Sequence, residues 1–200
     1  MVARPPRRSA EASLLAALRE GLEDALLTCT AAGSENGPVE GTPYIGRVEV
    51  AALPLLRLGP ELVLRPELAL LARHRRWGPG PAPGELVSAG AGLAAEGVVL
   101  VVELGAHGQS EARRPERGGP GQRSASLEGR LSAYAVAGVR EVWSLDVDRT
   151  WTVAYRSPWG GAYRSRTLWY PGEAVPVTGL NNVAVETFAD AAPAGRRAGG

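Results

Sequence analysis

The chain has 200 residues, and all 22 of its basic side chains are Arg, because the sequence contains no Lys. A Schiff base, a pyridoxal-phosphate anchor and a P-loop each require the amine of Lys, so these mechanisms are excluded. Arg remains protonated in proteins, which leaves His74 and His107 as the only basic side chains able to act as bases near neutral pH.

Length and composition predict one domain, since an apolar fraction of 44% is enough to form a buried core. We expect this domain to span residues 10–190, with disordered tails at 1–9 and 191–200. Residues 9–190 carry 17 Arg against 21 acidic residues, a net charge of −4. A mildly acidic body is not typical of a protein that coats nucleic acid without specificity, so any contact with nucleic acid would be local.

The lone Cys29 excludes an intramolecular disulfide, which fits a reducing compartment. The apolar run at 14–27 is interrupted by four charged residues, so it predicts neither a signal peptide nor a membrane span. We therefore predict a cytoplasmic protein that has no membrane partner.

The first predicted element is a helix over residues 9–28, because apolar side chains recur there at helical spacing: Leu14, Leu15, Leu18, Leu22, Ala25 and Leu26. A Gly-rich polar stretch at 31–43 predicts a loop. Residues 47–57 alternate weakly and indicate a strand that is interrupted at Pro54. Residues 61–71 are also strand-like, and Pro66 within them suggests a bulge, a sheet edge or the start of a strand.

Residues 97–104 (GVVLVVEL) form the clearest buried strand, and long loops are expected on either side of it, at 77–92 and 105–123. A helix is expected at 126–137, with Ser124 or Ser126 as its N-cap and Gly138 as its stop. A strand at 139–147 follows, and a right-handed crossover makes it parallel to the first. Alternation then predicts a β-meander with turns at 148–149 and PWGG, closed by a short strand or helical turn at 181–189.

Residues 61–188 resemble a bacterial family of restriction-endonuclease-like proteins, the Uma-two family of the PD-(D/E)XK superfamily. Pro66-Glu67 stands where that family has Pro-Asp, and Glu103 ends a hydrophobic strand where it has its second acid. The resemblance is strong over 97–104 and 127–156 and weak before 61. Its helix and strand pattern is matched by Leu131, Tyr134, Ala135, Ala137, Gly138, Val139, Glu141 and Trp143.

This resemblance implies an α/β fold of the restriction-endonuclease type. Its core would be a mixed β-sheet with an N-terminal helix, one crossover helix and a C-terminal β-meander. It also implies a Mg²⁺ or Mn²⁺ site formed by the carboxylates of Glu67 and Glu103 and the backbone carbonyl of Leu104. Arg130 stands in place of the family's Lys and would stabilise negative charge, but it cannot accept a proton. A bound metal would therefore have to activate the attacking water.

Three departures from the family pattern bear on activity. Glu67 is one methylene longer than Asp, which can displace a metal ligand by about an ångström. A Gly- and Arg-rich segment, with Glu116-Arg117 in place of the family's Asp-Arg, replaces the Ser-rich loop after Glu103. Arg130 in place of Lys is a weak sign of lost activity, because the whole chain lacks Lys.

Three hypotheses remain open. The first is a Mg²⁺-dependent DNA endonuclease with a partly degraded site, which could act as a homodimer. The second is an inactive nuclease-fold module that binds DNA or a protein. The third is a structural β-rich module, in which Glu67 and Glu103 would lie far apart.

Each candidate residue also has an interpretation without catalysis. A carboxylate at Glu103 must lie at an exposed strand end, pair with an Arg or bind a metal. Glu67 could simply be solvated, and Arg130 could belong to a surface salt bridge. The cluster at 73–76 (RHRR), followed by Trp77, could bind phosphate and stack a base but more often marks a solvated loop, and His107 has no clear partner.

Overall fold

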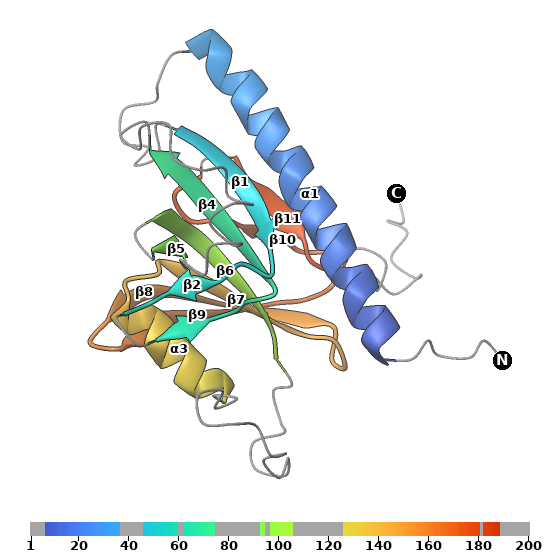
Figure 1. Ribbon diagram of the computed structural model, residues 1–200. Coiled ribbons are helices and arrows are strands. Elements are labelled where there is room, and N and C mark those ends of the chain that lie inside the picture. The colour runs from blue at the N-terminus through green and yellow to red at the C-terminus, as the bar shows by residue number, and fades with distance from the viewer. Residues whose placement is uncertain are drawn as a thin grey trace, which may run out of the picture.

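The computed structural model describes residues 7–36, 46–59, 62–74, 93–94, 97–105, 126–180 and 182–188. Within them, a six-stranded sheet with the order β1-β4-β6-β7-β8-β9 forms the centre (Figure 1). Its strands are β1 (Gly46–Ala52), β4 (Leu68–His74), β6 (Val98–Leu104), β7 (Glu141–Asp146), β8 (Trp151–Trp159) and β9 (Ala162–Trp169). Within this six-stranded sheet only β6 and β7 pair in parallel, so the predicted mixed sheet is confirmed.

The first helix, α1 (Arg7–Asn36), covers one face of this sheet. The apolar stripe predicted from sequence packs there against the strands, with Leu18 and Leu22 fully buried. The predicted bounds of 9–28 were too short, and the loop expected from 31 is helical up to Asn36. Ala31, Ala32 and Glu35 favour helix, and one Gly costs only about 1 kcal/mol, so Gly33 does not end it.

The C-terminal strands cover the same face as α1. The pair consists of β10 (Ala174–Pro176) and β11 (Ala184–Glu186), so the short strand predicted in 181–189 is confirmed. A Cβ added to Gly21 would lie 3.0 Å from Val185 Cγ1, which explains how α1 approaches β11 so closely. Val175 and Val185 are buried there together with Trp143 of β7.

The opposite face carries the second described helix, α3 (Leu127–Val136), and a small sheet (Figure 1). As predicted, Ser126 is the N-cap, its Oγ accepting a hydrogen bond from the Gly129 N–H at 3.2 Å, and Gly138 follows the helix at φ +79°. This helix joins the parallel strands β6 and β7. The small sheet contains β2 (Leu56–Arg57), β3 (Val63–Leu64) and β5 (Leu93–Ala94).

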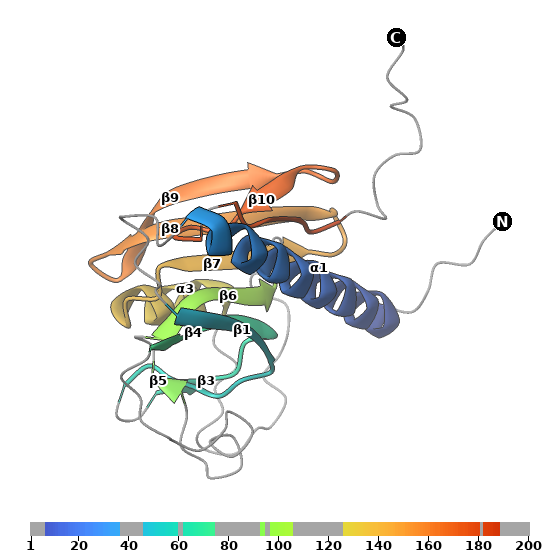
Figure 2. The ribbon, with the colours of Figure 1, turned by 90° about the horizontal axis from the view of Figure 1, so that it is seen from above.

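Prolines divide the two weaker predicted strands. The expected strand at 47–57 is β1 and β2 with a break around Pro54, as predicted. The segment 61–71 is not one strand, because β3 ends at Leu64 and β4 begins at Leu68, with Pro66 in the break. The predicted meander is confirmed, and Figure 2 shows β9 at the edge of the sheet beyond β8.

Several predictions fall outside the described residues, namely the loop at 77–92, all but the first residue of the loop at 105–123, and most of the two tails. No helix in the described part of the chain is long and apolar enough to cross a membrane.

Candidate active site

Glu67 and Glu103 are brought together by the pairing of β4 with β6. Leu68 of β4 pairs with Val102 of β6. Glu67 and Glu103 are the next residues along these two neighbouring segments of the chain, so they lie opposite each other. The Glu67 N–H donates to the Val102 carbonyl at 3.1 Å. Side chains alternate between the two faces of a sheet, which places both acids on the α3 face, together with Ala69 and Val101. This adjacency argues against the structural module in which the two acids would be distant.

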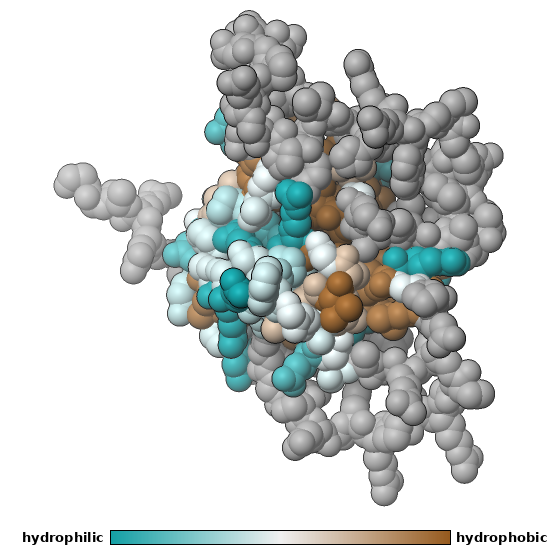
Figure 3. Space-filling view, turned by 90° about the vertical axis from the view of Figure 1, so that its left-hand side faces the viewer, coloured by the Kyte–Doolittle hydropathy of each residue, from teal (hydrophilic) through white to brown (hydrophobic). Residues whose placement is uncertain are grey.

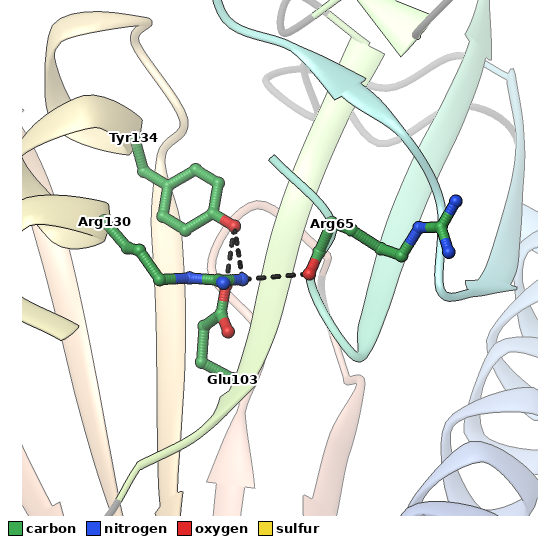
Figure 4. Close-up of polar contacts among 4 residues, drawn as sticks. All are labelled: Arg65, Glu103, Arg130 and Tyr134. Atoms are coloured by element: carbon green, nitrogen blue, oxygen red, sulfur yellow. Dashed lines mark hydrogen bonds and ion pairs between the residues drawn. The ribbon is translucent and has the colours of Figure 1, made fainter. Parts of the chain in front are cut away.

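Two residues of α3, Arg130 and Tyr134, donate hydrogen bonds to Glu103 through three atoms (Figure 4). Arg130 Nε donates to Glu103 Oε1 at 3.0 Å, and Arg130 Nη2 donates to the same oxygen. Tyr134 lies one helical turn further along, and its hydroxyl also donates to Oε1, at 2.5 Å. Three donors therefore converge on one carboxylate oxygen.

A backbone oxygen completes the environment of Arg130. Its Nη2 donates to the Arg65 carbonyl at 2.9 Å, and Figure 4 shows the Arg65 side chain pointing away from this contact. The side chain of Arg130 is 24% exposed and that of Glu103 is 6% exposed. The ion pair is thus buried on the sheet side and reaches solvent through Arg130. This is the pairing with an Arg that sequence analysis gave as one of three possible environments for Glu103.

Burial and mutual contacts shift the pKa values of Glu103, Tyr134 and Arg130. Burial raises the pKa of Glu103 above its usual value, Arg130 and Tyr134 oppose this rise, and the charge of Glu67 adds to it. Burial likewise raises the pKa of Tyr134, and the Glu103 carboxylate adds to that rise, so the phenol stays a donor. Burial would lower the pKa of Arg130, but Glu103 outweighs it and the pKa rises.

Two site residues were not predicted from sequence as functional. Tyr134 lies four residues after Arg130, and this helical spacing was the available signal. Ser144 is the partner of Glu103 in the parallel ladder of β6 and β7, where paired side chains share a face. Its Oγ is buried and has no hydrogen-bond partner among the described residues. A hydroxyl within an otherwise buried strand was the signal here.

The carboxylates of Glu67 and Glu103 and the backbone carbonyl of Leu104 are the candidate ligands of the expected metal site. Two carboxylates on one face supply the hard oxygen ligands that Mg²⁺ prefers, and Leu104 can offer only its backbone, because its side chain packs on the opposite core. Among the described residues, no three or more His, Cys, Asp or Glu side chains form a metal-binding group. The residues fit a metal held by two carboxylates, provided that Arg130 yields Oε1 or the metal takes Oε2.

Two other buried acids have structural roles. Glu141, which lies on the α1 face with Trp143, is fully buried and accepts from Trp143 Nε1 at 2.8 Å, Arg156 Nε at 2.7 Å and the Thr178 N–H at 2.6 Å. Asp146 accepts the backbone N–H groups of Asp148 and Arg149, each at 3.1 Å, and thereby holds the turn before β8. Both acids have their hydrogen-bond partners within the fold.

The other candidate site residues from the sequence lie outside the described residues or have side chains that are not described. Glu116, Arg117 and His107 are outside the described residues, as are residues 75–77. His74 ends β4, but its side chain is not described.

The fold matches that of a solved protein. The crystal structure of "a putative nuclease belonging to DUF820" from Anabaena variabilis superimposes with a TM-score of 0.55 at 12% sequence identity. The match covers 93% of this chain and 82% of that one. No family model matches the sequence, and no curated protein does. The chain therefore shares the mixed α/β fold of that protein at low sequence identity.

Proposed function

We propose that this protein is a metal-dependent nuclease that hydrolyses phosphodiester bonds in DNA. One observation carries the proposal. Glu67 and Glu103 lie side by side where β4 begins and β6 ends, and Arg130 of α3 donates to Glu103. A solved neighbour of this fold, itself described as "a putative nuclease", supports the choice of reaction.

Each residue has a distinct role in this proposal. Glu67 and Glu103 would hold Mg²⁺ or Mn²⁺, with the backbone carbonyl of Leu104 as a further oxygen ligand. When bound, the metal would lower the pKa of a water and offset charge on the phosphate. Arg130 would exchange Glu103 for a phosphate oxygen, to which its planar guanidinium can donate two hydrogen bonds. Arg130 thus neutralises charge and removes no proton.

A second candidate function rests on the contacts of Glu103 Oε1. Arg130 and Tyr134 already satisfy this oxygen, and the positive charge of Arg130 already compensates the carboxylate. If Arg130 does not move, the group is a buried salt bridge that holds α3 on the sheet. The protein would then be an inactive nuclease-fold module that binds DNA or another protein.

Cleavage of supercoiled plasmid DNA in Mg²⁺ or Mn²⁺ separates the two functions. We expect nicked or linear product from the wild type and at least a hundredfold less from Glu103→Gln. Glu128→Gln is the control, because Glu128 is an exposed acid on α3 that makes no contact with Glu103 in this site. Equal cleavage by Glu103→Gln would refute the site, and absence of cleavage with either metal would favour the binding module.

Metal binding provides a second measurement. Calorimetric titration with Mn²⁺ should give heat for the wild type and none for the Glu67→Gln/Glu103→Gln double variant. Heat that persists in the double variant would show that the metal binds elsewhere.

A further inference from the structure

The β8–β9 hairpin and its flanking turns have an unusual charge composition. Residues 149–172 contain four Arg, three Trp and three Tyr, and no Asp or Glu. The body of the chain is mildly acidic, so this acid-free segment is a local concentration of positive charge. Basic side chains interleaved with aromatic rings are typical of surfaces that bind single-stranded nucleic acid.

Three of the four guanidinium groups of this segment lie against aromatic rings. Arg164 Cζ is 4.4 Å from the centre of the Trp159 ring, and Arg166 Cζ is 5.9 Å from that of Tyr155. Arg149 Cζ lies 4.9 Å from the Trp151 ring. A cation held over a ring is kept in position while its N–H groups remain available to a ligand.

Arg164 and Arg166 have no carboxylate partner among the described residues. Arg130 and Arg156, by contrast, are bound to Glu103 and Glu141. Both hairpin arginines are exposed, and they alternate along β9 on one side of the strand. Their charge is therefore available to an external anion.

Trp159 offers a stacking surface at the tip of the hairpin. Trp159 is 68% exposed although Arg164 lies over one face of its ring, so much of the indole remains accessible to solvent. A nucleic-acid base can stack on such an exposed ring whatever its sequence. On the side of the molecule drawn in Figure 3, hydrophilic and hydrophobic side chains also lie exposed next to each other.

A second copy of the chain is a poor occupant for this edge. β9 is the last strand of the sheet, so it could pair with the β9 of another copy. Antiparallel pairing centred on Ser165 would place Arg164 of one strand opposite Arg166 of the other. Like charges directly across a pair of strands are destabilising, and charged side chains commonly protect sheet edges from such pairing.

We propose that the β8–β9 hairpin binds single-stranded nucleic acid, with phosphates on Arg164 and Arg166 and a base stacked on Trp159. The proposal rests on the proposed function only in choosing a nucleic acid over an acidic polypeptide. The surface is separate from the candidate active site. A Cβ added to Gly161 at the tip would lie 3.3 Å from Val136 Cγ2 at the end of α3, whereas Arg130 lies about 9 Å earlier along that helix.

Fluorescence anisotropy with a labelled oligothymidylate in EDTA tests this surface without catalysis. We expect Trp159→Ala and the double variant Arg164→Gln/Arg166→Gln each to weaken binding about tenfold or more. The double variant should also reduce the salt dependence, by about 0.7 in the log–log slope for each lost phosphate contact. Arg57→Gln, which removes an exposed strand Arg elsewhere, should bind as the wild type does.

The alternatives give different results. Unchanged binding by both hairpin variants, or equally tight binding of a poly-glutamate peptide, would overturn the proposal. Glu128→Gln, which changes an exposed acid on α3 with no role in either site, should retain full affinity for the oligonucleotide. If Glu103→Gln loses cleavage while the hairpin variants bind normally, the hairpin proposal fails and the active site stands. If the hairpin variants lose affinity and neither the wild type nor any variant cleaves DNA, the hairpin proposal stands and the proposed active site fails.

Discussion

Arg130 donates from both Nε and Nη2 to a single oxygen of Glu103, Oε1. The other oxygen, Oε2, has no hydrogen-bond partner among the described residues. An Arg–carboxylate pair is commonly bidentate, with one bond to each oxygen, and this one is not. Glu67 and Ser144 share the sheet face of Glu103, and Oε2 is the oxygen through which Glu103 could hold a metal without displacing Arg130.

Removing Arg130 should destabilise the fold by about 2 kcal/mol, because Arg130→Met leaves a nearly buried carboxylate without its cation. This value is below that for a fully buried pair, since Arg130 is partly exposed. The double variant Arg130→Met/Glu103→Gln should recover to within about 1 kcal/mol of the wild type. Urea denaturation of the four proteins measures the coupling, and additive losses would show that the pair contributes nothing.

The two buried Glu–Arg pairs, Glu141–Arg156 and Glu103–Arg130, should contribute differently to the free energy of unfolding. Glu141→Gln should cost about 3 kcal/mol, because Arg156, Trp143 and the Thr178 N–H all lose an ionised acceptor. Glu103→Gln should cost about 1 kcal/mol, since only one of its oxygens is used and an amide oxygen still accepts there. Denaturation midpoints of the two variants provide the comparison. A larger loss for Glu103→Gln would make Glu103 primarily structural.

Tyr134→Phe removes a hydroxyl that donates to Glu103. We expect a loss of about 1 to 2 kcal/mol, typical of a hydrogen bond to a charged group. The pKa of Glu103 should rise further, because Tyr134 is one of the groups that lower it. Titration of the Glu103 carboxyl by NMR in the wild type and the variant tests this. A lower pKa in Tyr134→Phe would contradict the assigned direction of the hydrogen bond.

Stability should fall as pH rises through the titration of Glu103. Burial raises the pKa of this carboxyl above 4.5, so between 4.5 and the raised pKa the folded chain holds a proton that the unfolded chain has released. Unfolding free energy then decreases with pH across that window and levels off above it. Urea midpoints from pH 4 to 7 should show this slope in the wild type and lack it in Glu103→Gln. If the urea midpoint depends on pH in the same way in both proteins, the pKa of Glu103 is not raised in the folded chain.

The parts of the fold that depend on local pattern could be predicted from sequence. The stripe from Leu14 to Leu26 gave α1 and its buried side, because burial follows helical periodicity directly. The buried run 97–104, α3 and β7 gave the parallel crossover. The far end of α1 was missed, since one Gly in a helix-favouring segment is too weak a signal to end it.

The site could be predicted only in part. A carboxylate at Glu103 required a compensating partner, and Arg130 was already a candidate from the resemblance. Their contact joins residues 27 positions apart, so it depends on how α3 lies over the sheet. The Arg65 carbonyl carries no pattern in the sequence, and the hydroxyl of Ser144 within a buried strand is only a weak signal. They become visible only when β4, β6, β7 and α3 are assembled.

The two ends of the described chain complete one core together, because α1 packs beside β10 and β11 on the same face of β6 and β7. During synthesis, a chain that ends before residue 174 lacks Val175, Val177, Val183 and Val185, and its strands would have an uncovered apolar face. The core on this face can therefore close only once β10 and β11 have been added. Until then the chain would expose an apolar sheet face of the kind that makes folding intermediates prone to aggregate.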